Sequence, residues 1–219
     1  MASAVIFDLE GTLIDILNGH VKAYDEVVAR KYGLKFTRED MLKGYGMHPH
    51  RIIKEYLRRN GIDEGDCQKL ADAKQALLRS KYRRELKVLP GAKKLLQELQ
   101  DNGVQTALAS STPQQNVEFM LKDPGLWGYF QAIIVGEDVP EAKPKPHIFL
   151  LAAEKLGVDP GDCVVVEDSV VGLKAAKAAG MKTIAVLTGG QPKDEISREK
   201  PDILAKTLEE VTVELIRNL

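Results

Sequence analysis

Cysteine is scarce in this chain of 219 residues, which contains only Cys67 and Cys163. Cys67 falls in a segment with a helical pattern, and Cys163 begins an apolar run typical of a buried strand. We therefore expect two reduced thiols rather than a disulfide, which disfavours a small fold stapled by disulfide bonds. Reduced thiols are typical of a cytoplasmic protein.

The chain also lacks an excess of charge of either sign and any long hydrophobic run. It has 31 basic and 32 acidic residues and a net charge of −1, so no overall field attracts nucleic acid or an acidic membrane. No apolar stretch reaches the length of a membrane span, and no charged region precedes a hydrophobic signal core at the amino terminus. We expect a soluble cytoplasmic protein, a monomer or weak homodimer, whose partners are small molecules. One basic cluster has acidic residues interspersed with it, so we interpret it as a solvated helix face rather than a nucleic-acid surface. It comprises Arg79, Lys81, Arg83 and Arg84.

The sequence is rich in apolar segments that alternate between two patterns. With 44% hydrophobic residues, the chain can bury a sizeable core. Continuous apolar runs occur at residues 4–7, 106–109, 132–135, 164–166 and 183–187, and helical patterns occur between them at 114–121, 147–156 and 173–179. This alternation predicts an α/β fold with a doubly wound, Rossmann-like parallel sheet.

Residues 17–85 interrupt this alternation, because apolar positions recur there at helical spacing with little strand signal. Breaks at Gly33, Gly44-Tyr45-Gly46 and Gly61 divide the segment into helices with short connections. Such helices would bury their apolar stripes against one another as a small bundle. The predicted organisation is a core formed by residues 1–15 and 88–219, with an all-helical cap subdomain at 16–87.

Four groups of polar residues stand either at the end of an apolar run or in a loop. Asp8 ends the first run, a serine and threonine cluster ends the second, Lys143 stands in a loop, and Glu167-Asp168 end a later run. Ligands bind outside the carboxyl ends of the strands in open parallel sheets. Any one cluster could be a helix cap, but four that converge at one edge predict a phosphate-handling site.

Hydrolysis of a phosphate monoester requires a nucleophile, a proton for the leaving oxygen and positive charge around the transferred group. Asp8 is the candidate nucleophile, which would form an aspartyl phosphate, and Glu10 is the candidate acid and base. Lys143 would neutralise the growing charge. The hydroxyl of Ser110 and main-chain donors of the Ser111 loop would hold the phosphoryl oxygens.

A cation is expected beside these groups, since several carboxylates next to a phosphate would otherwise repel it. Asp8 and Asp168 offer the hard oxygen ligands that Mg²⁺ prefers.

The order and spacing of these clusters resemble those of the haloacid dehalogenase superfamily, in particular its phosphatase and β-phosphoglucomutase-like branch with a helical cap. The matching segments are Asp8-Leu9-Glu10-Gly11-Thr12-Leu13, Ala107-Leu108-Ala109-Ser110, Lys143-Pro144-Lys145-Pro146, and Glu167-Asp168-Ser169 with Gly172. The resemblance implies that Asp8 is nucleophile and metal ligand, that the backbone carbonyl of Glu10 and the carboxylate of Asp168 are further ligands, and that Glu167 orients metal-bound water. Gly11 and Thr12, with Ser110 and Ser111, would belong to the phosphate-binding loops.

Glu10 departs from the family pattern, in which most phosphatases carry aspartate at this position. Glutamate keeps a carboxylate of similar intrinsic pKa. The extra methylene displaces that carboxylate, and a misplacement of about 1 Å can cost on the order of 100-fold in rate. Glu10 is therefore expected to slow one of the half-reactions or to prolong the life of the aspartyl phosphate.

The cap is expected to select the substrate by closing over the core. The turn from Lys43 to His48, with Gly46, resembles the specificity loop of the family, and His20 and Lys74 are candidates to face the same cleft. A mutase of this branch would carry an arginine on the loop to hold a distal phosphate, where this chain has Met47. This difference favours hydrolysis.

We therefore predict a Mg²⁺-dependent phosphatase for a small phosphorylated metabolite, such as phosphoglycolate or a sugar phosphate. Two alternatives remain open: a β-phosphoglucomutase-like mutase, and a phosphate-ligand-binding protein that Glu10 has impaired as a catalyst. A dehalogenase is disfavoured, because Lys143 and Glu167-Asp168 have a metal-phosphatase arrangement.

Overall fold

The computed structural model describes residues 3–219, so the first two residues of the predicted core segment 1–15 lie outside the described residues. Its main sheet has six parallel strands in the order β5-β4-β1-β6-β7-β8. These strands are β1 (Ala4–Phe7), β4 (Gln105–Ala109), β5 (Ala132–Ile134), β6 (Cys163–Glu167), β7 (Lys182–Val186) and β8 (Ile203–Ala205). The predicted fold class, a doubly wound parallel sheet, is confirmed.

Strand β1 lies in the middle of the sheet, where Phe7 is level with Leu108 of β4 and Val166 of β6. All four of its side chains are buried, which explains why the run is apolar without interruption. Val5 and Phe7 point into one hydrophobic layer, and Ala4 and Ile6 into the other.

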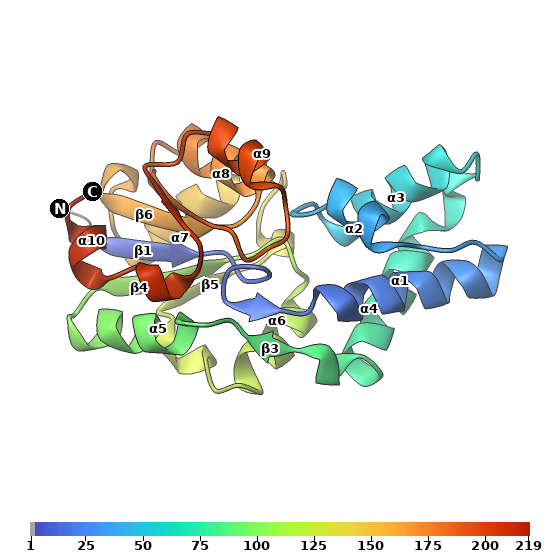
Figure 1. Ribbon diagram of the computed structural model, residues 1–219, viewed down its shortest axis with the longest axis horizontal. Helices are drawn as coiled ribbons and strands as arrows, with labels where there is room; N and C mark the ends of the chain where they lie inside the picture. The colour runs from blue at the N-terminus through green and yellow to red at the C-terminus, as the bar shows by residue number, and fades with distance from the viewer. Residues whose placement is uncertain (1–2) are drawn as a thin grey trace.

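Helices cover both faces of the sheet (Figure 1). Helices α5, α6 and α10 contribute to the layer that contains Phe7, and α7 and α8 contribute to the opposite layer. The helices of the core are α5 (Ala92–Asp101), α6 (Gln114–Lys122), α7 (His147–Leu156), α8 (Val170–Ala178), α9 (Lys193–Arg198) and α10 (Val213–Arg217).

Four further helices form a separate bundle beyond the carboxyl end of β1, on the right in Figure 1. They are α1 (Leu17–Tyr32), α2 (Arg38–Lys43), α3 (Pro49–Arg59) and α4 (Cys67–Ser80). The chain has few aromatic residues, 5% in all, yet three rings meet here: Phe36 lies 4.7 Å from Tyr24 and 4.9 Å from Tyr56 between ring centroids. The bundle thus has its own hydrophobic core, and we call it the cap.

Two antiparallel segments connect the cap to the sheet. They are β2 (Ile14–Asp15) and β3 (Lys87–Val88), and Leu89 N donates a hydrogen bond to Leu13 O at 2.9 Å just beyond them. The chain therefore enters and leaves the cap through one short two-stranded ribbon.

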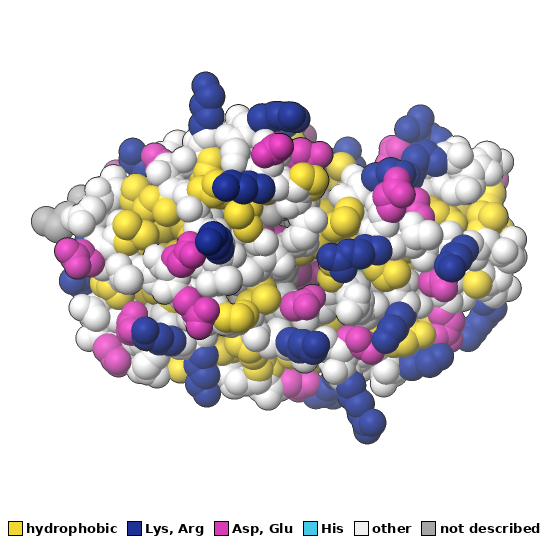
Figure 2. Space-filling model, viewed as in Figure 1, with side chains coloured by type: hydrophobic (Ala, Val, Ile, Leu, Met, Phe, Trp, Pro, Cys, Tyr) yellow, Lys and Arg dark blue, Asp and Glu magenta, His cyan; other side chains and the backbone are white. Residues whose placement is uncertain are grey.

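The two cysteines are buried and free. None of the helices among residues 3–219 combines the length and apolar character that crossing a membrane requires. On the face drawn in Figure 2, basic and acidic side chains are interspersed.

Candidate active site

Asp8 follows directly after β1 and lies at the carboxyl edge of the sheet. The residue is only 8% exposed, and Asp8 N donates to Val166 O of the neighbouring strand at 3.0 Å. Lys143 Nζ donates to Asp8 Oδ1 at 2.7 Å and to Ala109 O at 3.1 Å. The end of β1 and the loop before α7 thus bring together a carboxylate and an amine that are 135 residues apart in sequence.

The protonation of this pair follows from burial and from the neighbouring charges. Burial raises the pKa of Asp8 to about 7 and outweighs the opposite influence of Lys143. Burial alone would lower the pKa of Lys143, but the carboxylates of Asp8 and Glu167 hold it above its usual value. Lys143 is therefore a permanent buried cation beside Asp8.

Both carboxylate oxygens of Glu167 form contacts within the protein. Its Oε1 accepts from Lys143 Nζ at 2.7 Å, and its Oε2 accepts from the backbone N of Asp168 and from the backbone N and hydroxyl of Ser169 at 2.8–2.9 Å. This carboxylate holds Lys143 in place and orients the loop that carries Asp168.

One carboxylate oxygen of Asp168 accepts a hydrogen bond, and the other has no hydrogen-bond partner. Thr12 Oγ1 donates to Asp168 Oδ1 at 3.3 Å, whereas Oδ2 is buried without a hydrogen-bond partner. A buried carboxylate oxygen without a partner is costly. Burial and the charges of Glu167 and Asp8 raise its pKa well above the usual value.

This arrangement fits a hard cation. Asp8, Glu167 and Asp168 each offer an oxygen, and these atoms lie within 4.8 Å of one another. Gly11 leaves the space open: its φ is +86°, and a Cβ at this position would lie 2.0 Å from Asp168 Oδ2. Oxygen ligands in a compact buried cluster are those that Mg²⁺ prefers.

The backbone carbonyl of Glu10 lies in the same region and is covered from the cap. Tyr45 Oη donates to it at 3.4 Å. Burial and the carboxylates of Asp168, Glu10 and Asp8 raise the pKa of Tyr45 well above its usual value, so its hydroxyl keeps its proton.

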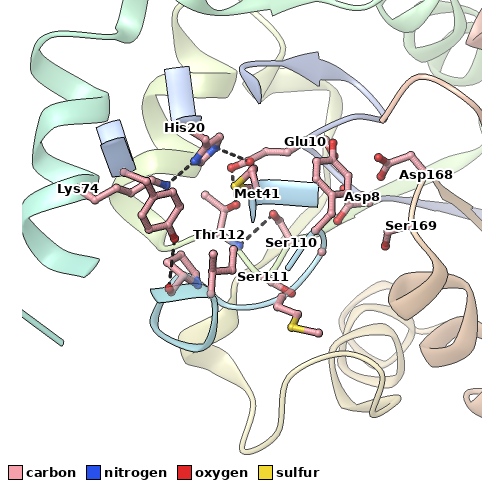
Figure 3. Close-up of a pocket in the computed structure, with 16 residues that line it drawn as sticks. Asp8, Glu10, His20, Met41, Lys74, Ser110, Ser111, Thr112, Asp168 and Ser169 are labelled. Carbon is pink, nitrogen blue, oxygen red and sulfur yellow. Dashed lines mark hydrogen bonds and ion pairs between the residues drawn. The ribbon is translucent and has the colours of Figure 1, made fainter. Parts of the chain in front are cut away.

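The side chain of Glu10 turns away from Asp168, toward the cap (Figure 3). One carboxylate oxygen accepts from Thr112 Oγ1 at 2.6 Å, and the other lies 2.6 Å from His20 Nε2. Burial alone would raise the pKa of Glu10, but the adjacent His20 and Lys74 groups and the contact with Thr112 lower it to about 2. Glu10 is therefore ionised in this arrangement.

His20 and Lys74 form a buried pair behind Glu10. Lys74 Nζ contacts His20 Nδ1, lies 4.6 Å from the centroid of the Tyr24 ring, and is fully buried. Burial lowers the pKa of Lys74 to about 7 and also lowers that of His20, although the charge of Glu10 acts in the opposite direction on both.

The loop after β4 supplies hydroxyl and amide groups. Thr112 N donates to Ser110 Oγ at 3.2 Å, whereas Ser111 Oγ is buried without a partner. Ser110, Ser111 and Thr112 line one cavity with Asp8, Glu10 and Asp168. An unpartnered hydroxyl in such a loop is available to an anionic ligand.

The cap closes this cavity to about 50 Å³, room for a few water molecules. The cap side is formed by apolar and aromatic residues together with Gly46, His20 and Lys74. The apolar and aromatic lining residues are Tyr24, Met41, Tyr45, Met47, Pro49 and Ile52.

Most residues predicted from the sequence converge on this cavity or directly behind it. Gly11 and Thr12 do not line it: Gly11 N bonds to Ile14 O, and Thr12 is buried against Asp168. The sequence reading missed Thr112 as the anchor of Glu10 and Tyr45 as the cover of the Glu10 carbonyl. Both stood beside residues already singled out, Thr112 after Ser110-Ser111 and Tyr45 between Gly44 and Gly46.

Comparisons with known proteins agree with this geometry. A family model for haloacid dehalogenase-like hydrolases matches residues 2–180. A bifunctional riboflavin kinase/FMN phosphatase of Arabidopsis thaliana is 38% identical over 85% of this chain, which spans 48% of that protein's length. The fructose-1-phosphate phosphatase YqaB of Escherichia coli K12 is 33% identical, over 84% of this chain and 96% of the other.

Solved structures show the same arrangement of elements. A family IA hydrolase from Entamoeba histolytica superimposes with a TM-score of 0.87 at 27% identity, over 100% of this chain and 98% of the other. CbbY from Rhodobacter sphaeroides, solved in complex with phosphate, gives 0.82 at 27% identity, over 99% and 100% of the two chains. With its parallel sheet, its carboxylate cluster and its phosphatase relatives, this chain belongs to the haloacid dehalogenase-like hydrolases and acts on phosphate esters.

Proposed function

We propose that this protein is a Mg²⁺-dependent phosphatase that hydrolyses small organic phosphate monoesters through an aspartyl phosphate on Asp8. The observation that carries the proposal is the contact between Asp8 and the buried cation Lys143, 2.7 Å apart, at the floor of a cavity shared with Glu10, Ser110 and Asp168. Phosphoryl transfer depends mainly on positioning and on charge stabilisation. Both are provided by groups held in place before a substrate arrives.

In the first step, an Asp8 oxygen attacks phosphorus and the bond from phosphorus to the ester oxygen breaks. The departing alkoxide takes a proton from the carboxylic acid of Glu10, and the alcohol leaves. In the second step, water attacks the phosphorus of the aspartyl phosphate and gives a proton to the Glu10 carboxylate. The bond to Asp8 breaks, so phosphate leaves and both side chains return to their initial states.

Before a substrate binds, Glu10 is ionised, because its pKa is lowered to about 2. The first step requires that Glu10 take up a proton. A negatively charged phosphate entering the cavity favours this uptake, because a nearby like charge raises the pKa of a carboxyl group.

The cation would be held by Asp8, Asp168 and the backbone carbonyl of Glu10, with Glu167 orienting its water. When bound, Mg²⁺ supplies positive charge that offsets the repulsion between the carboxylates and the phosphate. The unpartnered Oδ2 of Asp168 supports this assignment.

The cap side of the cavity favours hydrolysis over phosphosugar mutation. A mutase must hold a second phosphate, which requires a cationic group opposite Asp8. Met47 lines the cavity at the position where a mutase would carry an arginine, while His20 is already engaged with Glu10 and Lys74 with His20. Relatives named as phosphoglycolate phosphatases and as a β-phosphoglucomutase support a small phosphorylated metabolite as the substrate class.

The test is phosphate release from phosphoglycolate, fructose 1-phosphate and β-glucose 1-phosphate, with and without Mg²⁺. We expect release only with Mg²⁺, and a fall of at least about 1,000-fold in Asp8→Asn, whose amide is neither a good nucleophile nor a charged ligand. Activity that persists in Asp8→Asn would overturn the assignment of the nucleophile.

The same panel separates the alternatives. Interconversion of glucose phosphates with little free phosphate would identify a mutase. Release by Glu10→Asp, but not by the native chain, would identify a binding protein whose catalysis Glu10 has impaired.

A further inference from the structure

Asn116 of α6 is a fully buried amide at the boundary between the core and the cap. Its Oδ1 accepts from Arg79 Nη1 at 2.7 Å, and its Nδ2 donates to Gln75 Oε1 at 2.7 Å. Both partners belong to the cap, since Gln75 and Arg79 lie one turn apart on α4. A buried amide is costly unless it is hydrogen-bonded, so Asn116 is satisfied in this way only while α4 is seated against α6.

The sequence placed Arg79 in a basic cluster on a solvated face, but the structure does not leave its side chain fully exposed. It is half-buried, and its neighbour in that cluster, Arg83, forms an ion pair with Asp123 at the end of α6. Gln75 and Arg79 on α4, and Arg83 in the turn that follows it, all contact α6 or the residue after it.

The donor and the acceptor of each of these hydrogen bonds can be assigned, starting from Arg79. Arginine can only donate, so Arg79 requires the oxygen of Asn116, and the amide nitrogen of Asn116 must then face Gln75 Oε1. Gln75 Oε1 also accepts from Lys74 Nζ at 3.2 Å. The amide of Gln75 therefore holds Lys74 from one side while His20 contacts it from the other.

The same assignment of donors and acceptors extends to Glu10. When Lys74 donates to His20 Nδ1, Nε2 is the ring nitrogen of a neutral His20 that carries the proton, and it lies 2.6 Å from the Glu10 carboxylate. The chain of contacts thus links a half-buried arginine at the edge of the cap to the carboxylate in the cavity.

We propose that Gln75, Arg79 and Asn116 form a latch between cap and core that positions Lys74 and His20 on Glu10. When the hydrogen bonds of the latch form, closure of the cap is coupled to the orientation of Glu10 as acid and base. Gln75, Arg79 and Asn116 are positioning residues that do not touch the substrate. The inference deepens the proposed function and rests on it.

Two substrates test the latch, because only one needs the acid. Fructose 1-phosphate has an alkoxide leaving group that must be protonated, whereas p-nitrophenyl phosphate releases a stable phenolate. The ratio kcat/KM reports only the steps up to departure of the alcohol, so it isolates the acid role of Glu10. Loss of a general acid costs about 100- to 10,000-fold, and we expect Asn116→Leu to cost about tenfold with fructose 1-phosphate and at most about twofold with p-nitrophenyl phosphate.

Matched variants separate positioning from damage to the fold. Gln75→Leu should reproduce the selective loss, whereas Gln75→Glu keeps an oxygen for Asn116 and Lys74 and should retain more fructose 1-phosphate activity. Arg84→Met is the control, since Arg84 is exposed and has no hydrogen bond or ion pair with any residue in 3–219. Equal losses with both substrates, or no loss in Asn116→Leu, would overturn the latch.

Hydrogen exchange provides a readout that needs no turnover. We expect faster amide exchange in α4 and in the β2–β3 ribbon of Asn116→Leu than in the native chain, because the cap opens more often. Unchanged exchange would refute the latch even if the native chain hydrolysed neither ester, an outcome that would separately refute the proposed phosphatase.

Discussion

Lys74 carries its amine into the boundary between cap and core, where the side chain is fully buried. Its neighbours are the imidazole of His20, the amide of Gln75 and the ring of Tyr24. Burial lowers the pKa of Lys74 from 10.5 to about 7. A lysine with such a pKa exchanges its proton near neutral pH, as groups at functional sites often do.

This burial links stability to pH. Between about pH 7 and 10.5 the unfolded chain holds a proton on Lys74 that the folded chain has lost, so the free energy of unfolding rises with pH in this window. We expect the native chain to gain about 1–2 kcal/mol from this residue between about pH 7.5 and 9. Lys74→Met should lack that gain.

Urea unfolding at the two pH values measures the difference. Lys69→Met is the matched control on the same helix, because the Lys69 side chain is 86% exposed, and its pH dependence should follow that of the native chain. Parallel pH dependences for the native chain and Lys74→Met would show that Lys74 remains protonated when folded.

At the scale of elements, helix α8 packs directly against the carboxylate that fixes Lys143. Gly172 lies in its first turn, and a Cβ at this position would lie 1.8 Å from Glu167 Oε1. The helix approaches the end of β6 this closely only because residue 172 has no side chain.

Gly172→Ala should therefore displace Glu167 and weaken its contact with Lys143. We expect a loss of stability of about 1–3 kcal/mol, typical of overpacking in a buried site, and a fall of at least about tenfold in Mg²⁺-dependent phosphate release. Thermal unfolding and steady-state kinetics measure the two effects. Ala176→Gly, in the same helix, is a control that should cost stability without a comparable fall in kcat.

The sequence predicted the main elements because their signals are local. The apolar runs that became β1, β4 and β6 are buried on both faces and read as continuous hydrophobic segments. The ribbon of β2 and β3 was not foreseen, since strands of two residues carry no periodicity to detect. Strand β8 was also missed, although β5, of the same length, was predicted.

The site was partly predictable for the same reason. Strand order brings Asp8, Ser110 and Asp168 to one edge, and their positions follow from the strand ends. The rotation of Glu10 toward His20 and Thr112 depends on contacts from two separate units, which no local pattern encodes. Gln75 and Asn116 likewise resemble ordinary polar residues on helices until the cap is docked.

Considered as a whole, the molecule has a cavity too small for its proposed substrates while the cap is seated. About 50 Å³ is well below the ~300–1,000 Å³ of typical ligand pockets. Substrate entry therefore requires the cap to move, and the β2–β3 ribbon is the only connection between the two units along the described chain.

A phosphate analogue should shift the molecule toward the seated state. We expect Mg²⁺ with vanadate to slow hydrogen exchange in α4, α6 and the β2–β3 ribbon, because a ligand that binds the closed form raises its population. Helix α10, which packs against α5 at the end of the core away from the cap (Figure 1), serves as an internal control. Equal protection of all elements, or none, would contradict closure around the ligand.

The position of β1 also sets an order of events during synthesis. Ala4 pairs with Gln105 on one side and Cys163 on the other, so the central strand must wait for more than a hundred residues before either neighbour exists. Contacts so distant in sequence form slowly. The cap, whose buried hydrophobic cluster is complete by Ala71, can fold as the chain emerges, while the strand that leads to the nucleophile stays unpaired until β4 has been made and gains its second neighbour only with β6.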